Sequence, residues 1–423
     1  MKNIITAFSL FLMLIGYSQS FTKKFKNEGL RLDFIFEGNV HKTNVKLDAI
    51  KRIANWNGRK VNLDRNLLQG DAEINVYDLK TNEKIYTQSF STLYQEWLTQ
   101  NDAQNNVFFV EQVLYIPFPK NDFRVQVNLF FNNVPKEVFN QTFNSNDLKK
   151  IKAITADTAF KTIKKATSNK NVINLTFVAE GFTKANEQNF YDAVNKSIQA
   201  LFKYPSFKKY KDQFNITAAF TISKDSGVTI PSKNIYKNTI AQSTFDTFGA
   251  ERYLTTNKLF KLHDALANTP ADHIIILANS DQYGGAGIFN GYTIATLFGK
   301  TFDEVVVHEF GHSFAGLGDE YFYADDIFSD NAHQNTVEPW VRNNTTLVDF
   351  ESKWKNKLPE NTMIPTPYTT DGTDDLGVYL GIEGGKVYIP HQDCRMHTNT
   401  AKDFCSVCSD AIEELILHYT VQK

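Results

Sequence analysis

The apolar residues of this chain change their spacing near residue 150, and that change limits the folds open to it. Before this point apolar and polar residues mostly alternate, as in residues 31–36 and 123–129. Such alternation is typical of β-strands that bury one face. We therefore expect residues 21–150 to form an N-terminal β-sandwich, with a helical period only near residues 93–98.

Beyond a Lys-rich stretch at residues 149–170, expected strands alternate with expected helices. This order predicts an α/β domain over residues 151–423, so the whole chain is expected to be an α+β multidomain protein. The expected strands are 171–178, 214–222 and 271–278, the first expected helix is 187–203, and a Gly-rich loop and strand follow at 283–292.

Residues 1–20 have the pattern of a secretory signal peptide. Lys2 precedes the apolar run from Ile4 to Tyr17, and small and polar residues follow. The run is shorter than the roughly 20 apolar residues of a membrane span, although an N-terminal anchor remains an alternative. We expect export to the periplasm, the cell surface or the medium, with no transmembrane segment after signal cleavage.

The charge balance argues against a polyanionic partner. The chain has 45 basic and 47 acidic side chains and a net charge of -2. A nearly neutral protein has no long-range field that attracts nucleic acid. We therefore expect no nucleic-acid binding.

Residues 308–312, His-Glu-Phe-Gly-His, carry the strongest chemical signal. On a helix, residues four apart share a face, so His308 and His312 would direct their imidazoles to one point and bind one catalytic zinc ion. Glu309 would then lie close enough to act as general base on an attacking water. A structural helix with two buried histidines is the alternative.

A catalytic zinc ion needs a third protein ligand. Gly316 can end the helix in the left-handed conformation and bring Asp319 or Glu320 back to the metal. The Gly-x-x-Asp spacing resembles the metzincin pattern, with one extra residue after the second histidine, and favours Asp319. Glu338 or Glu351 on a later helix would be the ligand in another class of zinc peptidase.

Further candidates lie on both sides of this motif. Met396 is expected to form a Met-containing turn below the metal, and His391 and His397 are weaker alternative ligands. Tyr321 or Tyr388 is a candidate for stabilising the oxyanion. Gly285 and Gly287 lie in a stretch that would be either a strand beside the substrate or a tight turn with an ordinary strand.

The three cysteines are Cys394, Cys405 and Cys408. Their number excludes a multi-disulfide scaffold. The Cys-x-x-Cys spacing of Cys405 and Cys408 is that of half a zinc site or of a redox pair, but no second such pair and no neighbouring βαβ signature accompanies it. We expect a structural role, with a disulfide from Cys394 to one of the other two.

Several separated motifs together resemble the IgA peptidase family (M64) of bacterial metallopeptidases, across essentially the whole mature chain. The resemblance implies an exported, zinc-dependent endopeptidase with a metzincin-like catalytic domain, with His308, His312 and Asp319 as ligands and Glu309 as base. The motifs that carry it are 31–33, 90–97, 180–183, 225–228, 283–290, 308–321, 394–396 and 404–408.

The expected function is therefore hydrolysis of peptide bonds in a protein or peptide substrate whose identity the sequence leaves open. The β-rich N-terminal part also suits a different class, a surface adhesin or glycan-binding protein with a structural or vestigial zinc site. A purely structural site has no use for Glu309, which argues against that alternative. Oligomeric state is not predicted.

Overall fold

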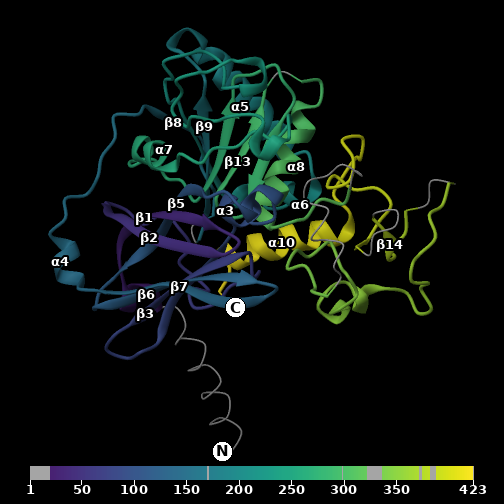
Figure 1. The fold of residues 1–423 in the computed structure, drawn as a ribbon, viewed down its shortest axis with the longest axis horizontal. Coiled ribbons are helices and arrows are strands. Elements are labelled where there is room, and N and C mark those ends of the chain that lie inside the picture. Colours follow the sequence, from purple (N-terminus) through teal and green to yellow (C-terminus); the bar gives the residue numbers. More distant parts are fainter. Residues whose placement is uncertain are drawn as a thin grey trace, which may run out of the picture.

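In the computed structural model the described parts of the chain are residues 20–168, 171–297, 299–321, 336–370, 374–381 and 387–422. Figure 1 shows the N-terminal strands on one side of the molecule, the second sheet with α5 and α8 on the other, and α10 running between them. The expected signal peptide lies outside the described residues, except for Ser20 at the start of α2 (Ser20–Lys24). Export therefore stays a prediction.

Two antiparallel sheets form the N-terminal part. One has the strand order β2-β1-β5 and the other β4-β3-β6-β7. Alternate side chains of both sheets enter one core, in which Phe34, Ile74 and Val127 are almost fully buried. The prediction of an α+β protein with several sheets is confirmed, and the β-sandwich domain of residues 21–150 stays a prediction. The bounds are β1 (Phe25–Asn39), β2 (Lys42–Ile53), β3 (Ala72–Asp78), β4 (Lys84–Phe90), β5 (Phe108–Pro119), β6 (Phe123–Phe131) and β7 (Val134–Phe143), with the predicted helical turn at α3 (Leu93–Trp97) and α4 (Ser145–Lys149) at the end.

A six-stranded sheet of order β12-β13-β11-β9-β10-β8 forms the centre of the second part. The four inner strands are parallel and the two edge strands antiparallel to their neighbours. Inner strands are covered on both faces, which explains why every residue of β9 is buried, including the polar Asn174, Thr176 and Glu180. The bounds are β8 (Phe160–Lys164), β9 (Ile173–Glu180), β10 (Phe214–Ala219), β11 (His273–Ala278), β12 (Gly285–Ile288) and β13 (Tyr292–Thr296).

Helix α8 (Phe302–Ala315) packs against β12 and β13 and carries the His-Glu-x-x-His motif. It ends because Gly316 takes the left-handed conformation, with φ of 60° and ψ of 36°, as predicted. Any Cβ at Gly316 would lie 2.7 Å from the Trp340 ring. The other elements are α5 (Glu187–Leu201), α6 (Pro205–Lys208), α7 (Leu259–Ala265), β14 (Tyr379–Leu380), β15 (Tyr388–Ile389) and α10 (Ser406–Thr420).

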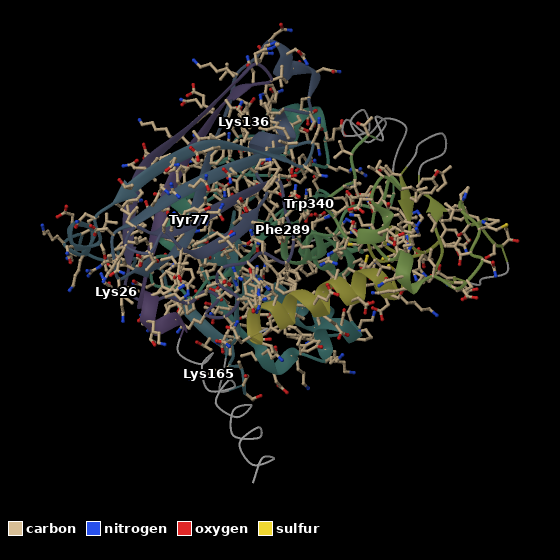
Figure 2. All side chains as sticks on the ribbon, turned by 90° about the horizontal axis from the view of Figure 1, so that it is seen from below. Lys26, Tyr77, Lys136, Lys165, Phe289 and Trp340 are labelled. Carbon is tan, nitrogen blue, oxygen red and sulfur yellow. The ribbon has the colours of Figure 1, made fainter. Side chains whose placement is uncertain are left out.

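The N-terminal strands and the second part are joined by specific contacts. Buried Arg31 bonds to Asp33 on its own strand at 2.6 Å and to Asp264 on α7 at 2.7 Å. Trp340 of the second part donates a hydrogen bond from Nε1 to Asp71 of the N-terminal part at 2.8 Å. Phe289 packs on the Trp340 ring from within the second part, with ring centroids 5.2 Å apart, and both are labelled in Figure 2. The Arg31 bonds therefore tie the N-terminal part to α7. The domain boundary near residue 150 remains a prediction.

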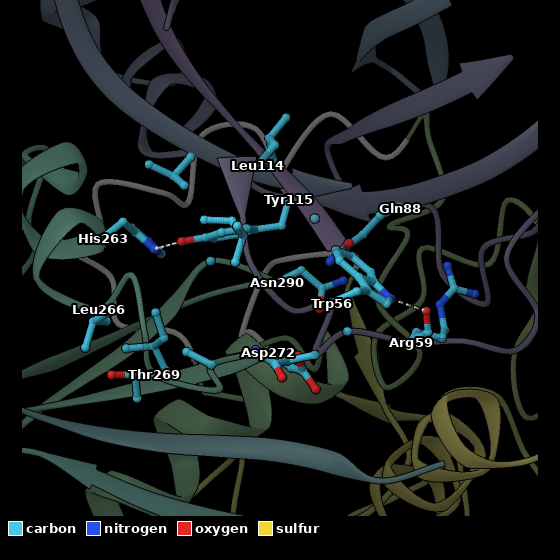
Figure 3. Close-up of a pocket in the computed structure, with 18 of the residues that line it drawn as sticks. Trp56, Arg59, Gln88, Leu114, Tyr115, His263, Leu266, Thr269, Asp272 and Asn290 are labelled. Atoms are coloured by element: carbon cyan, nitrogen blue, oxygen red, sulfur yellow. Dashed lines mark hydrogen bonds between the residues drawn. The ribbon is translucent and has the colours of Figure 1, made fainter. Parts of the chain in front are cut away.

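A small cavity of about 90 Å³ lies between the two parts (Figure 3). Trp56 and Tyr115 line it from the N-terminal part, and His263 and Asp272 from the second part. The Tyr115 hydroxyl lies 3.0 Å from Nδ1 of His263, so a hydrogen bond joins the two parts at this cavity. Among the described residues, no helix is long and apolar enough to cross a bilayer.

A buried histidine on β11 makes the stability of the fold depend on pH. His273 packs between Phe314 and Tyr419, and its Nε2 has no hydrogen-bond partner within the described residues. Burial lowers the pKa of His273 from 6.5 to about 3. Below the unfolded-state value the unfolded chain binds more protons, so stability falls as pH drops from about 6.5 towards 3.

We expect His273→Met to remove this loss of stability at low pH. The free energy of unfolding that wild type loses through His273 is on the order of 2 kcal/mol at about pH 5 and almost nothing at about pH 8. Denaturant unfolding of both proteins at the two pH values measures it. A stability difference between the variant and wild type that is the same at both pH values would contradict the assignment.

Candidate metal centre

One face of α8 brings His308 and His312 together. Their Nε2 atoms lie 3.0 Å apart. Nδ1 of His308 donates a hydrogen bond to the Arg395 carbonyl oxygen at 3.0 Å, and Nδ1 of His312 to the Leu317 carbonyl oxygen at 2.6 Å. These bonds place the proton on Nδ1 and leave the Nε2 lone pairs directed at a common point, as metal-binding histidines require.

Asp319 completes the cluster. Its Oδ1 lies 3.0 Å from Nε2 of His308 and 3.2 Å from Nε2 of His312. Burial would raise the pKa of Asp319, but the charges and hydrogen bonds of the two histidines lower it well below 3.8. The same pairing raises the pKa of His312 to about 9 against the effect of burial. Two imidazoles and one carboxylate on one point suit zinc.

Glu320, the other candidate for the third ligand, points elsewhere. Its Oε1 lies 3.1 Å from Sγ of Cys408, in a separate cluster. Glu338 bonds to Thr346, and Glu351 pairs with Lys355 on the surface. Within the described residues the geometry therefore leaves Asp319 as the only one of the four acidic candidates at the two histidines.

Glu309 lies beside the cluster without belonging to it. Burial raises the pKa of Glu309, and the neighbouring His308 and His312 oppose that rise. Together with His308, His312 and Asp319 it lines a pocket of about 380 Å³. A carboxylate with a raised pKa next to a cation site can accept and return a proton near neutral pH.

Edge strand β12 runs directly along the Glu309 side of α8. A Cβ at Gly285 would lie 2.9 Å from Cγ of Glu309, and one at Gly287 would lie 2.3 Å from the Glu309 carbonyl oxygen. Both glycines are therefore explained by close packing of strand on helix. Gly285 on the outer edge of β12 forms a β-bridge with Tyr253. A substrate strand could therefore pair only with the residues of β12 that follow Gly285.

Gly287→Ala tests this packing. The added Cβ would also lie 2.6 Å from Cβ of His312, so strand and helix must separate. We expect a loss of about 1–3 kcal/mol in stability and a clear fall in turnover. The matched control is Gly299→Ala, whose Cβ would meet no atom of the described part of the chain closer than 3.8 Å. Equal melting temperatures and turnover in the two variants would contradict the prediction.

The pocket has residues that sequence reasoning missed. Glu96 comes from α3 in the N-terminal part, and its Oε2 accepts a hydrogen bond from the Tyr253 hydroxyl. Burial raises the pKa of Glu96 to about 7. Arg252 lies with its guanidinium 5.7 Å from the Tyr321 ring. None of these residues has the spacing of metal ligands. The one sequence signal is that Glu96 lies in residues 90–97, a segment that carries the family resemblance.

The remaining candidates are placed as follows. Met396 is fully buried below α8, with Sδ 2.9 Å from the position of a Cβ on Gly311, where a Met-containing turn was expected. Tyr321 lines the pocket and stacks on His308. Tyr388 is in β15 and does not line the pocket. His391 bonds to Ser406 and His397 to the Gln392 carbonyl oxygen, so neither is at the centre.

The expected disulfide is not present. Cys394, Cys405 and Cys408 are all free thiols, and all are buried. The three sulfur atoms and a carboxylate oxygen of Glu320 gather within 4.8 Å of one another instead of two sulfurs forming a bond. The prediction was wrong because the Cys spacing alone did not show that a carboxylate would join them.

Models of known protein families match both parts of the chain. The model of the family described as IgA Peptidase M64 matches residues 162–380, and that of Peptidase M64 N-terminus matches residues 20–144. No curated protein sequence matches the chain. The crystal structure of metalloproteinase-II from Bacteroides fragilis is 10% identical over 53% of this chain and 81% of that one, with a TM-score of 0.22.

Proposed function

The chain belongs to the IgA peptidase M64 family, and from that premise we propose that it is an exported zinc-dependent endopeptidase. The observation that carries the proposal is the meeting of His308, His312 and Asp319 at one point beside Glu309, where all four residues line one pocket. Family membership supports peptide-bond hydrolysis. The donor set supports zinc, held by these three residues.

The chain's own groups have distinct roles in this proposal. Zinc, when bound, supplies a Lewis acid that polarises the scissile carbonyl and lowers the pKa of water to about 7. Glu309 takes a proton from the attacking water and passes it to the leaving amine. The carbonyl oxygens of Arg395 and Leu317 hold the two imidazoles in the orientation that this chemistry needs.

The antiparallel edge strand along α8 and the buried Met396 below it further support a metzincin-like catalytic domain. Residues 1–20 support export, which sequencing the amino terminus of the mature protein from cells would test. A mature protein that still begins at Met1 would refute that part.

The reaction itself is tested by incubating the purified mature chain with a library of unstructured peptides in isotopically heavy water. We expect new peptide termini, with the heavy oxygen in each new carboxylate and a site of cleavage inside the peptides. Intact peptides, in the presence of added zinc, would reject the peptidase proposal. Products trimmed only from their ends would reject the endopeptidase part.

Tyr321 is the remaining candidate for stabilising the oxyanion. The charge of Asp319 and burial both raise the pKa of Tyr321, so its hydroxyl stays protonated and able to donate a hydrogen bond. We expect Tyr321→Phe to lower kcat about 10²–10³-fold with KM and zinc content little changed, in line with the loss of one oxyanion donor. Tyr388→Phe is the control. A kcat equal to that of the control would remove Tyr321 from the mechanism.

A further inference from the structure

A second cluster of metal-binding side chains lies beside the first. Cys394, Cys405, Cys408 and Glu320 each direct one ligand atom to a common point, with all four atoms within 4.8 Å of one another. All four residues are buried, and Glu320 is fully buried. We propose that these residues bind a structural zinc ion, or another divalent cation that prefers thiolates, separate from the catalytic one.

The spacing of the four atoms suits a tetrahedral ion. Zinc–sulfur bonds of about 2.3 Å place the ligand atoms of a tetrahedral site about 3.8 Å apart. Oε1 of Glu320 lies 3.1 Å from Sγ of Cys408 and 4.0 Å from Sγ of Cys405. Small side-chain rotations are therefore enough to bring these atoms to coordination distances.

Backbone groups are arranged for sulfurs that carry negative charge. The amides of Met396 and Cys405 point at Sγ of Cys394, at 3.4 Å and 3.2 Å. The amide of Cys408 points at Sγ of Cys405 at 3.4 Å, and Cys405 is the N-cap of α10, a 15-residue helix. Amide hydrogen bonds and a helix N-terminus both stabilise a thiolate, which is the form that binds metal.

Glu320 gives an independent indication of a missing cation. Its Oε1 accepts a hydrogen bond from Asn343 at 2.8 Å, but its buried Oε2 has no partner among the residues that the structure describes. A buried carboxylate oxygen without a partner is costly, and a cation bound through both carboxylate oxygens, or through Oε2 after a small rotation of the carboxylate, would satisfy it. A disulfide would use two sulfurs and leave the third thiol and this carboxylate unsatisfied, whereas one metal ion uses all four groups.

The second cluster is also placed to hold the catalytic centre together. Glu320 follows Asp319, and its amide donates a hydrogen bond to the Met396 carbonyl oxygen at 2.9 Å. This bond joins the loop after α8 to the turn at residues 394–397. The same turn supplies the Arg395 carbonyl oxygen that accepts the hydrogen bond from His308. An ion held by Glu320 and the cysteines would therefore fix both the Asp319 loop and the support of His308.

The test uses the full mature chain with its histidine site disabled by His308→Ala and His312→Ala together, purified anaerobically with a reductant that does not bind metal. We expect about two zinc ions per wild-type chain and about one in the double variant. Replacing that remaining ion with cobalt is expected to give the intense near-ultraviolet absorption of thiolate-to-cobalt charge transfer.

Cys405→Ser with Cys408→Ser, added to the double variant, should abolish this absorption. Since these cysteine changes can impair folding, the decision rests on the histidine variant and on the intact mass of wild type. A histidine variant without metal, a cobalt form without thiolate absorption, or a mass showing a disulfide would each overturn the proposal. A wild-type chain with one ion and the thiolate absorption would support this site and count against the catalytic one.

Discussion

Replacing Glu309 with Gln is expected to lower kcat/KM for peptide cleavage about 10²–10⁴-fold, the usual contribution of a general base. Gln has nearly the same shape, so β12 can still pack on α8 and the pocket should keep its form. The amide cannot take a proton from water, however, and the fall should appear in kcat. Glu309 is not part of the His308, His312 and Asp319 cluster, so metal content should not change.

Steady-state kinetics and elemental analysis on the same preparations check this prediction. Glu351→Gln is a suitable control, because Glu351 pairs with Lys355 on the surface and lies away from the pocket. A Glu309→Gln enzyme within tenfold of wild type would show that another group activates the water. Loss of metal in that variant would show that Glu309 is a ligand.

The second large effect is expected from Asp319→Ala. Removing the carboxylate leaves two imidazoles, too few to hold zinc firmly in a catalytic site. We expect zinc affinity at this site to fall by more than the roughly 10–100-fold typical of outer-shell changes, and cleavage to fall with it. Metal content should drop by one ion per chain.

Competition with a chromophoric chelator measures that affinity. Glu338→Ala and Glu351→Ala are the matched controls, since both residues lie away from the histidines. Unchanged zinc in Asp319→Ala, or loss of zinc in either control, would transfer the third-ligand role to another residue and reject the geometry described above.

The central features of the fold were predictable because they depend on local pattern. Alternation predicted the N-terminal strands, and the helix over His308 and His312 ends at Gly316 as its conformational freedom predicts. The Gly-x-x-Asp spacing also favoured Asp319, and its carboxylate lies beside the histidines, while its role as a zinc ligand stays a prediction.

Features that depend on contacts between distant segments were not predictable. Glu96 reaches the pocket only because α3 packs against the second part. Glu320 was considered for the wrong cluster, since Asp319 and Glu320 are neighbours in sequence but point to different sites. The cysteines alone offer at most three ligands for a metal ion. The fourth group of the second cluster is Glu320, which comes from a distant segment, the loop after α8.

The most direct test of the central claim is a zinc titration of metal-free protein, with cleavage of an unstructured peptide as the readout. The account predicts no cleavage without metal, a return of activity that saturates at a stoichiometric amount of zinc, and no return at all in His312→Ala. Cleavage by the metal-free chain, or full activity of His312→Ala, would contradict it.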